Sequence, residues 1–284
     1  QEIEWKKGSP EAKQIINFIN NEMGMKPEHP IRPDSSVGIK PISATATKRV
    51  MRLALDYAIK HKRHSCTFVH KGNVMRLPEG YFRDWGYELA KKEFADHVVT
   101  EQEIEEAHAG IPPRGKVIVR DRLADEMFRL LLTRPEDYDV IATTNLNGDY
   151  LASMALAMVG DSGIAPTAYV GAKAAIFQSA QSAHINGNDE DINPSSVLLA
   201  GVMLFEHLGW KDSAELVSHS LIKTVADGYV TADLARVLDG AKVVRASEFC
   251  DRLVENFDEV RKSRVRQALQ RTIGGVTAVS AISH

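Results

Sequence analysis

The amino-acid sequence predicts an α/β fold, and three observations support this class. Amphipathic stretches typical of helices alternate with short apolar runs typical of buried strands between Ser43 and Ala142. The chain has 284 residues, of which 44% are hydrophobic, so it can bury the core of one large or two ordinary domains. Polar residues directly follow the apolar run Val140–Ala142, at the kind of strand end where ligands bind in open α/β sheets.

The first segment combines a helix and a strand. Ser9 is a suitable N-cap and Pro10 a suitable first helical residue, so a helix is expected from here to a stop at Gly24. Apolar residues recur between these points at helical spacing. After a proline-rich loop, a strand is predicted at Val37–Lys40, and Pro41 ends it.

The next predicted helix begins near Ser43 and carries both an apolar and a basic face. The net charge of the chain is -3, which gives no general attraction to nucleic acid. The basic side chains between residues 48 and 62 are therefore interpreted as a solvated face rather than a nucleic-acid surface. The predicted buried face consists of Val50, Leu53, Ala54, Tyr57 and Ala58.

The same alternation of strands and helices continues toward residue 142. A strand is predicted at Thr67–His70 and a helix from Pro78. The polar, acidic and then Gly- and Pro-rich segment Glu101–Gly115 is expected to be a surface insertion. A strand at Lys116–Val119 and an amphipathic helix at Asp121–Leu132 complete this part.

The second half is predicted to be mainly helical. A helix of small residues follows Asp149, and a glycine-containing loop is expected at Gly160–Gly171. A long polar loop is expected at Gln178–Pro194, and loops of this length in compact domains are often functional. The other predicted elements are a strand at Ala174–Phe177, helices at Ser195–Leu208, Asp212–Ala226, Thr231–Asp239 and Ser247–Phe257, and a basic tail.

Cysteine content and hydropathy indicate which cellular compartment to expect and whether a membrane span is expected. Cys66 and Cys250 form neither a disulfide framework nor a zinc motif, which favours a reducing compartment, the cytoplasm or the mitochondrial matrix. The longest apolar run, near Val197–Phe205, is too short to span a bilayer. Neither a nucleic-acid partner nor a membrane span is expected. Gln1 is not an initiator methionine, so a processed or partial chain is expected.

The polar stretch Asn145–Tyr150 is the first candidate site. The Asn-Gly pair at 147–148 is expected to turn the chain after the strand and to place Asp149 just beyond its end. A carboxylate there could bind Mg²⁺ or Mn²⁺ through oxygen. The alternative, in which Asp149 only caps the following helix, stays open.

Three other polar groups are candidates, and each also has a simpler interpretation. Lys71 follows a strand, with Asn73 nearby, and could polarise a carbonyl or transfer a proton; an exposed lysine in a turn is the alternative. Asp125 lies on the polar side of its helix, where a solvated charge is the alternative to a ligand. His184 lies among acidic residues that could bind a cation or form a plain polar loop.

Several motifs between Glu2 and Phe257 are weak singly but specific as an ordered set. They are GIKPIS at 38–43, VHKGNVMR at 69–76, EGYFRDWGYELA at 79–90, RPEDYDVIATTNLNGDY at 134–150, GIAPTAYVG at 163–171, INPSSVLLAGVML at 192–204 and LDGAKVVRASEF at 238–249. Together they resemble NADP-dependent isocitrate dehydrogenase of the bacterial type. The resemblance implies the isocitrate/isopropylmalate dehydrogenase-like fold, with the amino-terminal strands of the large domain absent.

The resemblance also implies a mechanism and a dimer. In this family a hydride passes from isocitrate to NADP⁺, and Mg²⁺ or Mn²⁺ polarises the ketone for decarboxylation to 2-oxoglutarate, a step of the tricarboxylic acid cycle. Lys71 and Asn73 match catalytic residues, and Asp125 a metal ligand, that one subunit supplies to its partner's site. Asp149 matches a metal ligand of the subunit's own site. The matching cofactor-binding residues are Asn193, Asp233, Arg236 and Arg134, the last reaching the partner's NADP 2′-phosphate.

Several features of the family are missing or altered. The amino-terminal segment that clamps isocitrate has no counterpart, and it is expected on another chain, removed or outside this sequence. Ser153 replaces the second metal aspartate of the family, and a hydroxyl is a poorer ligand for a hard cation than a carboxylate. The nucleotide loop at 178–186 lacks the family's His-Gly pair and lysine, and Ala232 replaces a tyrosine.

These losses fall on what a family member supplies to its own site, whereas the residues supplied across the dimer are kept. The chain is therefore predicted to be impaired in its own site and to complete a partner's site, as a homodimer or as a heterodimer with a full-length isocitrate dehydrogenase-like chain. An ordinary NADP-dependent isocitrate dehydrogenase and a non-catalytic structural subunit are the alternatives. The predicted parts are a clasp-like dimerisation segment (1–42), a small α/β domain carrying Lys71, Asp125 and Asp149 (43–159), a partial large domain (160–257) and a basic tail (258–284).

Overall fold

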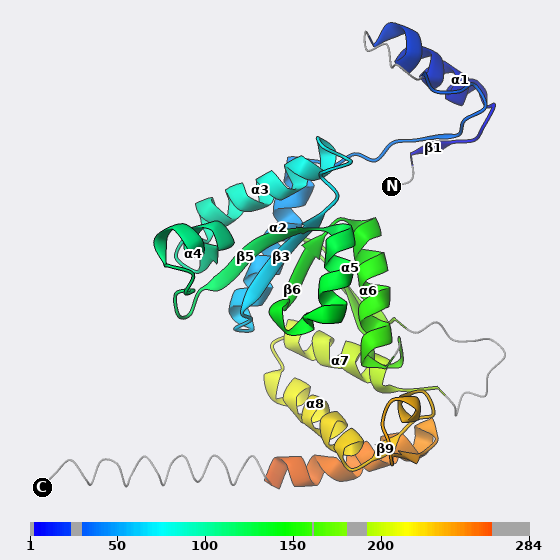
Figure 1. Ribbon diagram of the computed structural model, residues 1–284. Helices are drawn as coiled ribbons and strands as arrows, with labels where there is room; N and C mark the ends of the chain where they lie inside the picture. The colour runs from blue at the N-terminus through cyan, green and yellow to red at the C-terminus, as the bar shows by residue number, and fades with distance from the viewer. Residues whose placement is uncertain (1–2, 24–29, 161, 181–191, 263–284) are drawn as a thin grey trace, which may run out of the picture. The chain divides into compact units, whose positions relative to one another are not determined.

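A computed structural model describes residues 3–23, 30–160, 162–180 and 192–262 (Figure 1). The chain divides into two compact units, Gln1–Asp149 and Tyr150–His284. A hydrophobic cluster lies within each unit. The finer division into a clasp, a small domain, a partial large domain and a tail stays a prediction.

The first unit is built on a four-stranded sheet, visible at the centre of Figure 1. Its strands are β3 (Ser65–His70), β4 (Val98–Thr100), β5 (Val117–Leu123) and β6 (Val140–Thr143), in the spatial order β4-β5-β3-β6. Each neighbouring pair is parallel. Strand β3 is buried along its whole length, as expected for a central strand of a parallel sheet covered by helices. The predicted α/β class is confirmed.

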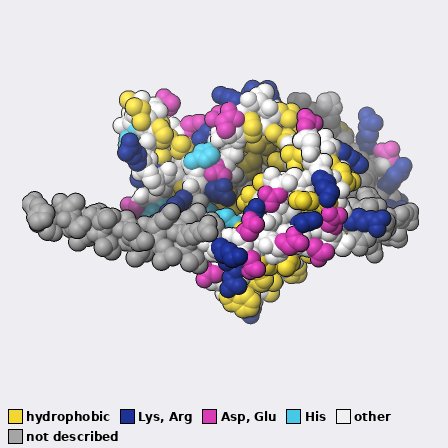
Figure 2. All heavy atoms as spheres, turned by 90° about the horizontal axis from the view of Figure 1, so that it is seen from below, with side chains coloured by type: hydrophobic (Ala, Val, Ile, Leu, Met, Phe, Trp, Pro, Cys, Tyr) yellow, Lys and Arg dark blue, Asp and Glu magenta, His cyan; other side chains and the backbone are white. Residues whose placement is uncertain are grey.

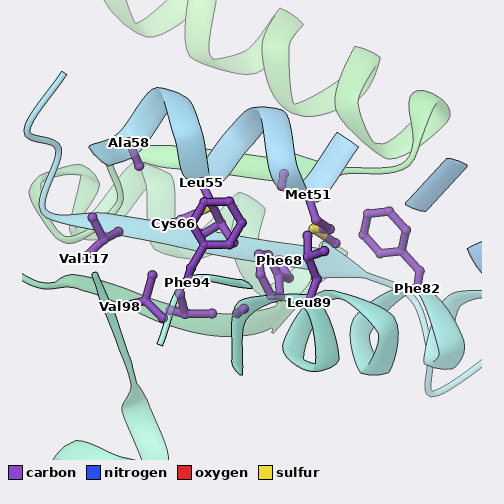
Figure 3. Packing of buried hydrophobic residues seen from close by; sticks show 13 residues of the cluster. Met51, Leu55, Ala58, Cys66, Phe68, Phe82, Leu89, Phe94, Val98 and Val117 are labelled. Carbon is purple, nitrogen blue, oxygen red and sulfur yellow. The ribbon is translucent and has the colours of Figure 1, made fainter. Parts of the chain in front are cut away.

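Helices α2 (Ala44–Lys60) and α3 (Pro78–Glu93) pack with β3 to form the core of this unit. Alternate residues of β3 face the two helices, because successive side chains of a strand point to opposite faces. Burying each of the larger apolar side chains contributes about 1.5–3 kcal/mol. Figure 3 shows the cluster, in which Met51 and Leu55 of α2 meet Cys66 and Phe68 of β3 and Leu89 of α3.

Helix α2 buries only part of the predicted face: Ala58 is fully buried and Ala54 packs against the core, but the other three predicted residues are exposed. Ser43 caps the helix as expected. Met51 and Leu55 are fully buried, whereas Val50 and Leu53 are 39% and 44% exposed. Apolar residues occur on both sides of α2, so helical spacing alone does not determine which side meets the sheet. Packing against β3 and α3 makes that choice.

The close approach of α3 to β3 depends on Gly86. A Cβ atom there would lie 2.9 Å from Phe68 Cε2 and 3.0 Å from Met51 Cε. Replacing Gly86 with alanine should therefore lower the free energy of unfolding by about 1–3 kcal/mol, measured by denaturant unfolding. The matched control is Gly80→Ala on the same helix, where an added Cβ meets no atom of the described chain within 4 Å. The control should hold or raise stability, and an equal loss in both variants would contradict the prediction.

Cys66 lies in this core, and neither Cys66 nor Cys250 forms a disulfide. The Cys66 side chain has no exposed surface. Burial raises the pKa of this thiol to about 12, because a thiolate loses its solvation in an apolar core. Cys66 is therefore a packing residue without nucleophilic character at neutral pH.

The N-terminal segment contains the predicted helix and strand. Its elements are β1 (Glu4–Trp5), α1 (Pro10–Asn17), the π-helical turn η1 (Phe18–Glu22) and β2 (Val37–Gly38). Ser9 caps α1, since its Oγ accepts a hydrogen bond from the Ala12 backbone N–H at 3.1 Å. Strands β1 and β2 pair in the antiparallel sense. The predicted stop at Gly24 lies outside the described residues.

The chain between α3 and β6 differs from prediction at three points, the first of which is strand β4, which was not predicted. The expected insertion Glu101–Gly115 contains helix α4 (Glu101–Ala107), which begins with a capping box formed by Thr100 and Glu103. Strand β5 extends to Leu123, so helix α5 (Ala124–Thr133) begins later than predicted. The cause is pairing with β3, which keeps Asp121 extended opposite Phe68. A local amphipathic pattern carries no information on such a distant partner.

The second unit contains two short sheets and several helices. Its elements are β7 (Pro166–Val170), β8 (Ala175–Ser179), α7 (Ser195–His207), α8 (Lys211–Ala226), β9 (Tyr229–Val230), β10 (Lys242–Val243) and a helix over residues 246–262, while α6 (Asn145–Val159) crosses the unit boundary. Short 3-10 turns are η2 (Pro135–Asp137), η3 (Ser162–Ile164) and η5 (Leu234–Arg236). Strands β7 and β8 are antiparallel, and β9 and β10 are parallel.

Two predictions for the second unit are wrong. The expected loop Gly160–Gly171 contains strand β7, which pairs with β8. The expected helix Thr231–Asp239 is only the 3-10 turn η5. The pairing of β9 with β10 brackets this segment, and Thr231 and Asp233 bond to each other instead of entering a helix.

The charged surface is mixed in sign. Figure 2 shows Lys and Arg side chains interspersed with Asp and Glu side chains over the face that it views. Within the second unit, for example, Lys223 Nζ lies 2.9 Å from Asp227 Oδ2. None of the helices in the described parts of the chain has the length and apolarity that crossing a bilayer requires.

Candidate functional site

Candidate residues follow the ends of three parallel strands in the first unit. Lys71 follows β3, Asp125 lies in the first turn of α5 after β5, and Asn145 begins α6 after β6. Lys71 Nζ donates a hydrogen bond to Asp125 Oδ1 within an ion pair. The parallel topology thus joins two candidate residues that are 54 positions apart in the sequence.

The Lys71–Asp125 pair is partly open to solvent. The side chains of Lys71 and Asp125 are 31% and 66% exposed. The hydrogen bond from Lys71 lowers the pKa of Asp125 below its ordinary value of 3.8, so the carboxylate is ionised at neutral pH. Neither residue is an isolated surface charge, because each is the partner of the other. Asn73 lies exposed in the turn that follows Lys71.

The turn after Lys71 is fixed by the buried His70. The Gly72 backbone N–H donates to His70 Nδ1 at 3.0 Å. Since Nδ1 accepts this bond, the ring proton is on Nε2, which lies 3.0 Å from Asp121 Oδ2. Tyr87 Oη donates to the other oxygen of Asp121 at 2.8 Å. The His70 ring therefore connects the turn carrying Lys71 to strand β5.

The charge states of this network follow from its hydrogen bonds. Burial opposes ionisation of Asp121, but the bonds from His70 and Tyr87 outweigh it and lower the pKa of Asp121. Burial, together with the charge of Asp121, raises the pKa of Tyr87. Gly72 lets the turn close over His70, because a Cβ there would lie only 2.9 Å from Nδ1. In this network the neutral His70 and Tyr87 side chains both donate to the carboxylate of Asp121.

Asp149 lies within helix α6 rather than in a turn before a helix. The Gly148 backbone N–H donates to the Thr144 carbonyl at 2.9 Å, so the Asn-Gly pair at 147–148 is part of the helix. The expected turn is therefore wrong, and so is the alternative in which Asp149 caps the helix. Asp149 and Ser153 are both exposed and, four residues apart, lie on one face of α6.

The candidate metal ligands have the right chemistry for a divalent cation, but there are too few of them. Asp125 and Asp149 offer carboxylate oxygens, the ligands that Mg²⁺ prefers in proteins. Within the described ranges, no group of three or more His, Cys, Asp or Glu side chains comes together as a metal site. Ser153 would add only a neutral oxygen. The described part of one chain therefore provides no complete metal centre.

Asn193 and Asp233, the expected cofactor-binding residues of the second unit, contact each other. Asn193 Nδ2 donates to Asp233 Oδ2 at 2.9 Å, and Thr231 Oγ1 donates to Asp233 Oδ1 at 2.5 Å. Asn193 Oδ1 accepts from the Ser195 backbone N–H at 2.9 Å. A side chain at Gly163 would collide with both Asn193 and Asp233. This cluster supports the start of α7, and it engages both ends of the Asn193 amide.

The two arginines expected to reach a cofactor are exposed. The Arg134 side chain is 58% exposed, with its Nε 3.7 Å from Asp137 Oδ2. Arg236 is the last residue of η5 and is also exposed. Of the altered nucleotide loop, residues 178–179 belong to β8. Residues 181–186, with His184 and the acidic positions 189–191, lie outside the part of the chain that the structure describes.

Sequence reasoning missed Glu79, the second residue of α3. Its side chain is 1% exposed, and its carboxylate accepts hydrogen bonds from the Lys71 backbone N–H and from Asn147 Nδ2. Acidic residues are common in the first turn of a helix, so the position of Glu79 gave no signal by itself. The available signal was its place as the first residue of the motif EGYFRDWGYELA.

A comparison with protein-family models shows to which family this chain belongs. The family model for isocitrate/isopropylmalate dehydrogenase matches residues 18–253. The chain belongs to this family. The match covers both units, so the resemblance stated from the motifs and the expected family fold are both confirmed.

Similar proteins within the family are isocitrate dehydrogenases. "Isocitrate dehydrogenase [NADP]" of Archaeoglobus fulgidus is 46% identical over 259 residues, which cover 91% of this chain and 62% of the relative. The protein of the same name from Staphylococcus epidermidis is 41% identical, with 90% and 64% covered. The crystal structure of isocitrate dehydrogenase from Methylococcus capsulatus gives a TM-score of 0.66 at 28% identity, covering 78% of this chain and 59% of that chain. The chain thus spans less than two thirds of these relatives.

Proposed function

We propose that this chain is an isocitrate dehydrogenase-like subunit that completes the active site of a partner instead of turning over substrate in its own site. The observation that carries the proposal is the division between kept and lost residues. Lys71, Asn73 and Asp125, which would serve the partner, are kept. Ser153, inside the matched region, replaces a metal aspartate that would serve the chain's own site. The partner is a full-length isocitrate dehydrogenase-like chain.

The residues offered to the partner suit proton transfer and the binding of a small hydroxy acid such as isocitrate. The Lys71 ammonium can hold or move a proton at a substrate oxygen or carbon, and the Asn73 amide can donate to a substrate carboxylate. Asp125 holds Lys71 at the strand end until substrate arrives. Arg134, in this proposal, reaches the NADP 2′-phosphate of the partner. NADP and a divalent cation, the cofactors of the family, would supply the hydride acceptor and the Lewis acid when bound.

A complementation assay tests the proposal. The partner is a full-length NADP isocitrate dehydrogenase whose own counterpart of Lys71 is replaced with methionine, so that its homodimer is inactive. Co-expression with this chain, and purification through one affinity tag on each chain, isolates the mixed dimer. Isocitrate-dependent NADPH formation should rise at least about 10²-fold over the inactive homodimer. A mixed dimer that forms without gaining activity would overturn the proposal.

Restoring an aspartate at position 153 tests the loss of the chain's own site. Ser153→Asp adds a second carboxylate one turn after Asp149 on the exposed face of α6. The affinity of the full chain for Mn²⁺, measured by calorimetry, should rise by about tenfold or more, because hard cations prefer charged oxygen ligands. The control is Ala157→Asp, which adds the same charge two turns from Asp149. An unchanged affinity, or an equal rise in the control, would show that Ser153 does not weaken the site.

An ordinary NADP-dependent isocitrate dehydrogenase is the second candidate, because a relative bearing that name is 46% identical to this chain. Turnover of isocitrate by the purified chain alone, with NADP⁺ and Mg²⁺ present, would favour it. A non-catalytic structural subunit would show neither turnover nor complementation. The bacterial and archaeal sources of the relatives, together with two cysteines that form no disulfide, favour the cytoplasm as the compartment over the mitochondrial matrix.

A further inference from the structure

Glu79 is a buried carboxylate that no part of the proposed chemistry uses. Its side chain is 1% exposed, and a buried charge is costly unless it is paired and hydrogen-bonded. Three donors from separate segments meet it. Lys40 Nζ lies 2.5 Å from Oε1, Asn147 Nδ2 donates to Oε2 at 3.1 Å, and the Lys71 backbone N–H also donates to Oε2.

This donor set fits only an ionised carboxylate. An ionised carboxylate is purely an acceptor, and all three neighbouring groups are donors. Burial opposes ionisation of Glu79, but the bonds from Lys40, Lys71 and Asn147 outweigh it and lower its pKa. An amide in the same place would have to turn its NH₂ group toward one of the donors. The three donors therefore favour an ionised carboxylate at position 79, on a side chain of the length of glutamate.

Glu79 joins two segments. One carries residues that would serve a partner's site, and the other carries a residue that would serve the chain's own site. The first is the turn with Lys71 and Asn73, which would serve the partner. The second is the start of α6, where Asn147 precedes Asp149 by two residues and Asp149 would serve the chain's own site. One Glu79 oxygen accepts from both segments. The other oxygen is neutralised by Lys40, which lies between β2 and α2.

We propose that Glu79 is a positioning residue that fixes the Lys71 turn against the first turns of α6, so that the residues given to a partner's site and the residue serving the chain's own site move as one body. The role in turnover rests on the proposed function. The mechanical link does not, because it concerns hydrogen bonds within one chain. The two can therefore be tested separately.

The mechanical link is tested by hydrogen exchange on the full chain. Glu79→Gln should raise the exchange rate of the backbone segment Lys71–Asn73 by about tenfold or more, since the bond that protects the Lys71 N–H is weakened or lost. The matched control is Glu88→Gln on the same helix, where a 53% exposed carboxylate pairs with Lys48 at 2.7 Å. The control should leave this segment unchanged. Unchanged exchange in Glu79→Gln would overturn the proposal.

The positioning role is tested in the mixed dimer. Glu79→Gln in this chain should lower kcat about 10- to 100-fold with a smaller change in KM, because a misplaced Lys71 loses reactivity more than the site loses binding. Glu79→Asp keeps the charge and should recover part of the loss. Should Glu79→Gln fail to fold, Asn147→Ala removes one donor and leaves the charge paired with Lys40. It should then raise exchange at the start of α6 and lower kcat in the same direction.

The outcomes separate this proposal from the proposed function. Faster exchange together with a kcat loss supports it. Faster exchange with full kcat, in a dimer where Lys71→Met is inactive, would overturn the positioning role and leave the proposed function intact. If Lys71→Met itself has no effect, the proposed function fails, and the exchange result alone decides whether Glu79 links the two segments.

Discussion

Replacing Lys71 with methionine in this chain should lower the turnover of the mixed dimer by about 10²- to 10⁴-fold. Methionine keeps the apolar length of the side chain but carries neither the charge nor the transferable proton. The Lys71–Asp125 pair is partly exposed, so its loss should leave the melting temperature nearly unchanged. The measurement is the rate of NADPH formation at saturating isocitrate, with thermal unfolding of the same preparation.

A second lysine provides the control for this substitution. Lys92 is exposed near the end of α3, and Lys92→Met removes the same charge from the same unit. It should leave turnover unchanged. Full activity in Lys71→Met, or equal losses in both variants, would show that the mixed dimer does not use Lys71. A loss of activity that follows a lower melting temperature would instead indicate a structural effect.

Replacing Asp121 with alanine should lower the free energy of unfolding by about 2–3 kcal/mol. The substitution leaves the Nε2–H group of His70, a residue only 2% exposed, and the Tyr87 hydroxyl without their common acceptor. The buried His70 donor and the half-buried Tyr87 hydroxyl would then lack the bond that offsets their lost hydration. Denaturant unfolding of the two proteins measures the difference.

The contribution of Asp121 also depends on pH in a defined direction. Its pKa in the folded chain lies below the ordinary value of 3.8, so the folded state takes up this proton less readily than the unfolded state. The stabilisation is fully present above that ordinary value and is lost as the pH falls through the folded value. The stabilities of wild type and Asp121→Ala should therefore converge in strong acid. Asp84→Ala, which removes a 53% exposed carboxylate, should instead match wild type at every pH.

The sequence predicted elements whose signals are local. Strand β3, the start of α3 at Pro78 and the cap of α1 at Ser9 follow from apolar runs and capping chemistry, and all three are confirmed. The inward face of α2 and the full length of β5 depend on partners far along the chain. Met51 is buried because it packs with Phe68 in the folded core. The spacing of apolar residues within α2 cannot predict a contact with a residue of another element.

The candidate site divides in the same way. Lys71 and Asp125 were placed at element ends by local pattern and assigned their roles by resemblance, but their ion pair is a product of parallel topology. The role of Glu79 was not predicted, because its partners Lys40 and Asn147 are 39 and 68 residues away in the sequence. Asp149 was expected in a turn because Asn-Gly is a strong turn signal, whereas the helix of α6 incorporated that pair. Tertiary packing decided each of these cases.

The buried thiol of Cys66 gives the molecule a built-in probe of its own opening. Alkylating reagents and peroxide react with thiolates, and this thiol is sealed beneath α2 and α3 with its ionisation suppressed. Reagent therefore reaches Cys66 only when the α2–α3 layer parts from the sheet. The labelling rate of Cys66, separated from that of Cys250 by peptide mapping, would report how often those transient separations occur, without any engineered cysteine.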